Sequence, residues 1–145
     1  MNHDRQTPSS LDSEEAVLGS LLIDPEAIET VARILKPDDF FRDKNRWIFQ
    51  AMLNLYNRKV PNDQITVAHE LARKKLLEPM GGTSYLGYLV SEVPTSVHVK
   101  YYAEIVKEYS ERRELIARGQ QMVEDGCNQT KPLKRPTKPI YERGG

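Results

Sequence analysis

The sequence has little of what defines several common protein classes. Its single cysteine, Cys127, excludes an internal disulfide framework and a cysteine-based zinc site within one chain. The longest apolar run, around residues 17–23, is broken by Gly19 and Ser20, so it falls short of the roughly 18 residues that a membrane span needs. The first ten residues lack the charged and then apolar layout of a secretion signal. These absences predict a cytoplasmic protein without a membrane association.

An excess of charge of either sign is also missing. The 21 lysines and arginines balance 21 aspartates and glutamates, although residues 1–98 carry 11 basic and 14 acidic side chains and residues 99–145 carry 10 and 7. Most of the basic excess lies in residues 131–145. Because neutralisation of phosphates supplies most of the affinity of proteins for nucleic acids, we do not expect the folded part to bind DNA directly.

The sequence contains no recognisable catalytic or cofactor-binding motif. The glycine pair Gly81-Gly82 is followed by Thr83 and not by the lysine of a phosphate-binding loop, so we interpret it as a helix end that needs left-handed backbone angles. Asp38 and Asp39 are interpreted as an acidic turn. The three histidines, His3, His69 and His98, lack the spacing of metal ligands. We therefore predict no catalytic residue, no metal site and no cofactor.

The spacing of apolar residues predicts an all-α fold. Positions such as Ile28, Val31 and Leu35 follow the three- and four-residue intervals of a helix face, and no segment shows the alternation of a strand. We expect a compact bundle of about five short helices and one long, projecting C-terminal helix. The predicted helices run from Ser10 or Asp12 to residue 23, from Pro25 to Pro37, over residues 43–58, from Thr66 to residue 75, from Thr83 to about residue 90, and over residues 95–125 before Gly126.

We predict that the chain has three segments. They are a flexible lead over residues 1–9, a helical domain over residues 10–126 and a disordered, basic, proline-rich tail over residues 127–145. We expect the side chains of Phe40, Phe41, Tyr56 and Ala72 to face the core. The long helix would reach about 45 Å, more than a small bundle can cover. Its first half should therefore close the core through residues such as Tyr102, Ala103 and Val106, while its second half projects or pairs with another helix.

Several short motifs stand in a fixed order along about four fifths of the chain. They are SLDSE at 10–14, AVLGSLL at 16–22, LKPDDFF at 35–41, IFQAM at 48–52, PND at 61–63, GG at 81–82 with YL at 85–86, and VPT at 93–95 with YAEIV at 102–106. Together they resemble the N-terminal domain of DnaB-type replicative helicases. Asn45, Gln64 and His98 depart from the family pattern at polar positions, which does not threaten the fold.

The resemblance implies a part in assembly and not in catalysis. In such helicases, which are ATP-dependent 5′–3′ DNA helicases, the N-terminal domains form a collar, usually a trimer of dimers, that docks primase and bears on loader contacts. Positions matching the primase-docking surface are Asp12, Tyr85, Ile116 and Met122, and Tyr85 fits equally well as a half-buried core residue. For self-association we single out Tyr109, Ile116 and Val123, since contacts between chains are the better explanation of apolar residues that lie beyond the bundle.

Two other functions are also compatible with the sequence. The family continues into a returning helix and a motor domain that these residues do not contain, so the chain is a shortened helicase, a gene fragment or a free-standing regulator of helicase rings. A small nucleic-acid-binding protein is the alternative from a different class, with a helix-turn-helix over residues 66–75 and 83–91. Against it, the segment 76–82 is long for that motif, and residues 85–90 offer no base-reading side chain.

Overall fold

The computed structural model describes residues 7–93 and 95–133, and these residues form helices and turns without a strand. The chain divides into two units, residues 1–112 and residues 113–145. The prediction of an all-α fold is confirmed. The flexible lead and the basic tail were predicted over residues that lie largely outside the described ones.

Helix α1 (Leu11–Ile23) begins after Ser10, one of the two residues predicted to cap it. The Ser10 side chain makes no capping hydrogen bond to the backbone, however, and its Oγ donates to Ser13 Oγ at 2.9 Å. Asp12 lies inside the first turn and is exposed. An acidic side chain in this position is favoured by the helix dipole.

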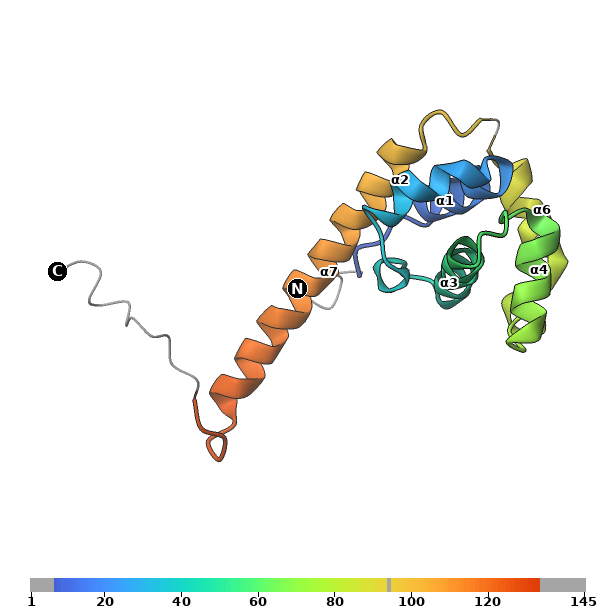
Figure 1. Ribbon diagram of the computed structural model, residues 1–145. Helices are drawn as coiled ribbons and strands as arrows, with labels where there is room; N and C mark the ends of the chain where they lie inside the picture. Colours follow the sequence, from blue (N-terminus) through green and yellow to red (C-terminus); the bar gives the residue numbers. More distant parts are fainter. Residues whose placement is uncertain (1–6, 94, 134–145) are drawn as a thin grey trace. The chain divides into compact units, whose positions relative to one another are not determined.

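Helix α1 packs closely against α6 (Thr83–Ser91) at Gly19 (Figure 1). A Cβ atom at this position would lie 2.3 Å from the backbone oxygen of Leu89 and 2.7 Å from a methyl group of Val93. Only a residue without a side chain therefore allows this crossing distance. In the sequence, Gly19 was notable only because it interrupts an apolar run.

A pair of short helical turns, η2 (Pro25–Ala27) and α2 (Ile28–Ala32), follows α1. Pro25 starts this segment as predicted, but α2 ends at Ala32, well before Pro37. Ile28, Val31 and Leu35 are buried as expected. The turn η3 (Pro37–Asp39) then places Asp39 so that its carboxylate accepts a hydrogen bond from the backbone N–H of Lys36 at 2.7 Å.

The two phenylalanines after η3 differ in burial. Phe40 is buried and its ring lies 5.1 Å from that of Phe49, whereas Phe41 is 38% exposed. The prediction that both are core residues is therefore wrong for Phe41. Its backbone is fixed instead, because its N–H donates to Glu14 and its carbonyl accepts from Arg46.

Helices α3 (Asp43–Asn57) and α4 (Gln64–Arg73) pack against each other; α3 also contacts α1 and α2, and α4 also contacts α6. Two predicted core positions are wrong here, since Tyr56 and Ala72 are exposed. The predicted start of α4 at Thr66 is two residues late. Asp63 caps the helix through 2.9 Å bonds from the N–H groups of Ile65 and Thr66, which is a standard N-cap arrangement.

A buried carboxylate joins α3 to α4. Glu70 accepts hydrogen bonds from Arg58 at 2.9 Å, from Arg73 at 3.0 Å and from the Asn54 amide at 3.2 Å. The bond from Arg58, together with those from Arg73 and Asn54, lowers the pKa of Glu70 to about 2. The buried charge is therefore balanced, as such groups require.

The segment after α4 contains a short helix that the sequence did not predict, α5 (Leu77–Met80). Proline is tolerated at position 79 because N–H groups in the first turn of a helix have no acceptor within that helix. Gly81 then ends α5 with φ of +113°, and Gly82 has φ of +72°. The predicted left-handed backbone at this glycine pair is confirmed.

The last helix, α7, runs over Val99–Cys127. It begins later than predicted, because Thr95 uses its hydroxyl to accept from the N–H of Val97 in the preceding turn. It also continues through Gly126, which does not end it. Within the first unit, Val99, Ala103 and Val106 are buried, and Ser110 donates to Asp39 at 2.7 Å. The predicted core role of Ala103 and Val106 is confirmed, whereas Tyr102 is half-buried.

Candidate docking surfaces

One candidate surface lies where α1 faces α6 and contains two of the residues singled out from the sequence. Asp12 is exposed in the first turn of α1. Tyr85 is only 9% exposed, and the Nζ of Lys44 lies 3.8 Å above the centre of its ring. Only a small part of the Tyr85 ring is therefore available to a partner, and a core position is the role that its burial favours.

Tyr88, which the sequence reasoning missed, is the more exposed tyrosine of this surface. It is 42% exposed, its ring stacks on that of Tyr85 with 5.9 Å between centroids, and its hydroxyl donates to Glu15 at 2.8 Å. The hydrogen bond to Glu15 raises the pKa of Tyr88 to about 12. Burial, with the charge of Glu15, raises the pKa of Tyr85 as well. Both phenols therefore keep their protons near neutral pH. We call Tyr85, Tyr88 and Glu15 together the tyrosine surface.

A chain of buried hydrogen bonds links Tyr85 of the tyrosine surface to α3 and α1. The hydroxyl of Tyr85 donates to Asn45 Oδ1 at 2.7 Å, and the amide nitrogen of Asn45 donates to Glu14 at 2.9 Å. Glu14 also accepts from the backbone N–H of Phe41 at 2.7 Å. Asn45 and Glu14 are both fully buried. This chain could not be predicted from the sequence, because its bonded side chains lie 31 and 40 residues apart.

The second candidate surface is a set of exposed apolar side chains on α7 in the second unit. Ile116 is 45% exposed, Met122 74% and Val123 67%, and Leu115, not singled out from the sequence, is also exposed. Positions 115 and 122, and likewise 116 and 123, are seven residues apart, so each pair lies on one helix face. We call these four residues the apolar face of α7. Tyr109, the other predicted self-association residue, belongs to the first unit and is half-buried.

The residues considered for chemistry are scattered. His69 is exposed on α4, and Cys127 is exposed at the end of α7. Across residues 7–93 and 95–133, no three histidine, cysteine or acidic side chains are grouped as metal ligands would be. Within the same residues, none of the helices combines the length and the apolarity needed to cross a bilayer. Helices α4 and α6 are separated by α5, unlike the two helices of a helix-turn-helix.

Comparison with known proteins identifies the family. The family model described as "DnaB-like helicase N terminal domain" matches residues 6–108. The replicative DNA helicase DnaB of Geobacillus stearothermophilus is 44% identical over 123 residues, which are 85% of this chain and 27% of that protein. The chain thus spans about a quarter of the length of the curated relatives that it matches.

Solved structures agree with this assignment. The crystal structure of the N-terminal domain of DnaB helicase from Mycobacterium tuberculosis is 42% identical with a TM-score of 0.81, over 83% of this chain and 88% of that one. A DnaB-like replicative helicase, whose structure was described with its interactions with primase, is 31% identical with a TM-score of 0.71, over 79% of this chain and 27% of that one. The chain belongs to the DnaB-like helicase N-terminal domain family.

Proposed function

We propose that this chain acts as the non-catalytic collar of a replicative DNA helicase, where it associates with further copies of itself and docks primase or a helicase loader. The observation that carries the proposal is the apolar face of α7, where four large apolar side chains of one helix segment are all exposed. Exposed apolar side chains that recur every seven residues are typical of helices that pair. Such a role in bacterial replication takes place in the cytoplasm.

The two candidate surfaces suit different partners. The apolar face of α7, with Tyr109, fits self-association, because helices of identical chains can pair through one seam. The tyrosine surface with Asp12 combines a stacked aromatic pair with acidic side chains and fits a primase segment that carries basic and apolar groups. Ile116 and Met122 are also proposed for primase docking. A relative whose structure was described with its interactions with primase supports primase as the partner.

The self-association half of the proposal is tested by light scattering of the 145-residue chain across a range of concentrations. We expect a dimer or a larger assembly, which Ile116→Glu should weaken by at least about tenfold because it buries a charge in an apolar seam. Ala117→Glu adds the same charge at an exposed position on the opposite side of α7 and should leave the assembly intact. A strict monomer at all concentrations would contradict the proposal.

The primase half is tested by titrating the helicase-binding domain of the cognate primase into the same chain by calorimetry. Tyr88→Ala and Met122→Glu should both weaken binding, because the first removes an exposed aromatic ring and the second places a charge in the contact. His69→Ala, on an exposed part of α4 outside both surfaces, serves as the control. Equal binding by all of these variants would reject the two surfaces as the docking site.

A further inference from the structure

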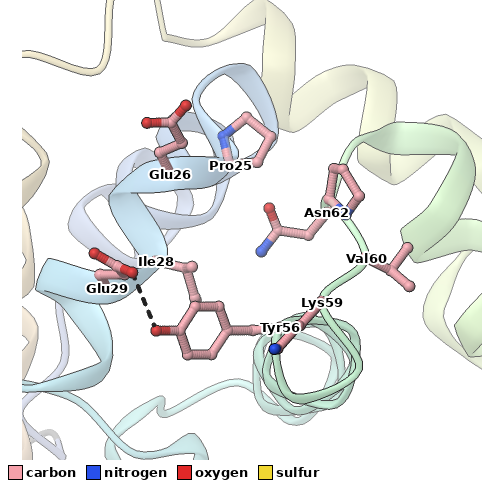
Figure 2. Close-up of a pocket in the computed structure, with 9 residues that line it drawn as sticks. Pro25, Glu26, Ile28, Glu29, Tyr56, Lys59, Val60 and Asn62 are labelled. Atoms are coloured by element: carbon pink, nitrogen blue, oxygen red, sulfur yellow. Dashed lines mark hydrogen bonds between the residues drawn. The ribbon is translucent and has the colours of Figure 1, made fainter.

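A pocket on the first unit shares no residue with either candidate docking surface. It opens between the η2–α2 segment and the C-terminal end of α3 with the following connection, and its volume is about 450 Å³ (Figure 2). This volume falls within the range of small-molecule and side-chain binding sites. Its walls are formed by Pro25, Glu26, Ile28, Glu29, Tyr56, Lys59, Val60, Pro61 and Asn62.

Asn62 is the unusual residue of this pocket. It is 1% exposed, and within the described part of the chain its Oδ1 atom has no hydrogen-bond partner. Figure 2 shows its amide group pointing from the connection after α3 toward Pro25 and Ile28 on the opposite wall. A buried carbonyl oxygen without a donor destabilises the fold. A ligand that supplies an N–H group would remove this cost, and the broad torsional preference of an asparagine side chain lets the amide turn toward it.

The charges around the pocket determine what kind of ligand fits. Glu26 and Glu29 are exposed on one wall, and Lys59 is the one basic residue among those that line it. The hydroxyl of Tyr56 donates to Glu29 at 3.4 Å, which holds that carboxylate beside the opening. Two carboxylates against one ammonium group favour a cationic ligand. The remaining walls are apolar, so the cation should be carried on an apolar stem.

We propose that this pocket binds an arginine side chain presented by a segment of a partner protein. A guanidinium group is planar and has five N–H donors, so it can donate to Asn62 Oδ1 and to Glu26 or Glu29 at once. Its flat face can also lie on the ring of Tyr56. An ammonium group is compact and strongly hydrated, and satisfies this combination less well. The pocket shares no residue with the tyrosine surface or the apolar face of α7, so this proposal is independent of the proposed function.

The test uses the 145-residue chain and two blocked peptides, Ac-Leu-Arg-Leu-NH2 and the same peptide with citrulline, which is a neutral isostere of arginine. Amide shifts in two-dimensional NMR spectra report where and how tightly each peptide binds. We expect the arginine peptide to shift the amide signals of the non-proline residues within 25–29 and 56–62. It should bind at least about tenfold more tightly than the citrulline peptide, since hydrogen bonds to charged groups are the stronger ones.

Variants separate recognition from folding. Asn62→Leu replaces the unpaired amide by an apolar group of similar size, so it should raise the thermal unfolding midpoint and weaken arginine-peptide binding at least about tenfold. Glu29→Gln should weaken binding about threefold to tenfold, and it tests the proposal even if Asn62→Leu fails to fold. Glu104→Gln removes a carboxylate from an exposed position of α7 and should change nothing.

Three outcomes would overturn the proposal. The first is that the arginine peptide produces no shifts at residues 25–29 and 56–62. The second is equal affinity for the arginine and citrulline peptides, which would mean that the charge is not recognised. The third is unchanged binding in Glu29→Gln and Asn62→Leu. None of these outcomes depends on self-association or on primase, so they leave the proposed function untouched.

Discussion

The two halves of α7 place their apolar residues in opposite environments. In the first half, Val99, Ala103 and Val106 recur at intervals of three and four residues and are buried in the first unit. In the second half, the residues of the apolar face form two pairs with seven-residue spacing, and all four are exposed. Both spacings place apolar side chains on one face of a helix, so burial and not spacing distinguishes the two halves. The change from buried to exposed apolar side chains within one helix therefore separates the half that closes the fold from the half proposed for association.

The largest expected effect comes from placing the same charge in each half. Ala103→Asp buries a carboxylate without a partner and should lower the free energy of unfolding by about 4 kcal/mol or more. Ile116→Asp places it on an exposed position and should change the free energy of unfolding by no more than about 0.5 kcal/mol. Urea unfolding at a concentration where the chain does not self-associate measures both.

The matched pair also gives the result that would contradict the comparison. If Ile116→Asp unfolds the chain as readily as Ala103→Asp does, the apolar face of α7 belongs to the core of a single chain. Its part in association would then be lost. If Ala103→Asp is harmless, the first half of α7 does not close the bundle.

A smaller effect on the free energy of unfolding is expected at Glu70, between α3 and α4. This residue contributes to folding and not to either candidate docking surface. Because the pKa of Glu70 is about 2 in the folded chain and about 4.3 in an unfolded one, the ionised form stabilises the fold above pH 4.3. That stability is lost as the pH falls from about 4.3 to 2. Glu70→Gln should cost about 1–2 kcal/mol at neutral pH and flatten the acid side of the stability profile.

Acid unfolding followed by circular dichroism, with the wild-type chain and Glu70→Gln side by side, measures this effect. The arginine partners are about half exposed, so the cost stays below that of breaking a fully buried ion pair. Identical acid profiles for the two proteins would show that Glu70 does not link α3 to α4. Self-association at neutral pH should not change, because Glu70 lies outside both candidate surfaces.

The smallest expected effect is a stabilisation. Lys75 follows α4 with φ of +61°, a left-handed conformation that costs a residue with a Cβ atom about 1 kcal/mol. Lys75→Gly should therefore raise the free energy of unfolding by about 0.5–1 kcal/mol, as measured by thermal or urea unfolding. Lys74→Gly, at a neighbouring position with φ of −89°, is the control and should lower stability. If both substitutions destabilise the chain, the left-handed backbone at Lys75 is not relevant in solution.

Much of the fold could be predicted because it depends on local signals. The helix spacing around Ile28 and Val31 and the left-handed glycines Gly81 and Gly82 follow from neighbours within a few residues. Phe40 and Phe41 could not be separated, since adjacent aromatic residues in a turn carry the same local signal. Only the contact of Phe40 with Phe49 and the exposure of Phe41 distinguish them.

The candidate surfaces could be predicted less completely, because they depend on contacts between distant residues. Exposed apolar positions such as Ile116 and Met122 could be singled out, since the length of the last helix already exceeds what a small bundle covers. Tyr88 and the unpaired amide of Asn62 could not. The position of Tyr88 depends on its hydrogen bond to Glu15, which is 73 residues away. The missing partner of the Asn62 amide depends on which atoms surround it after folding.

The hydrogen-bond chain from Tyr85 through Asn45 to Glu14 has a consequence for how such proteins can diverge. Each link has a direction, since the phenol donates to the amide oxygen and the amide nitrogen donates to the carboxylate. Replacing one member reverses or removes a donor and leaves its neighbour unsatisfied in the interior. A substitution at Asn45 is therefore tolerated when the new side chain both accepts from Tyr85 and donates to Glu14. Any other substitution there should require a matching change at Tyr85 or Glu14.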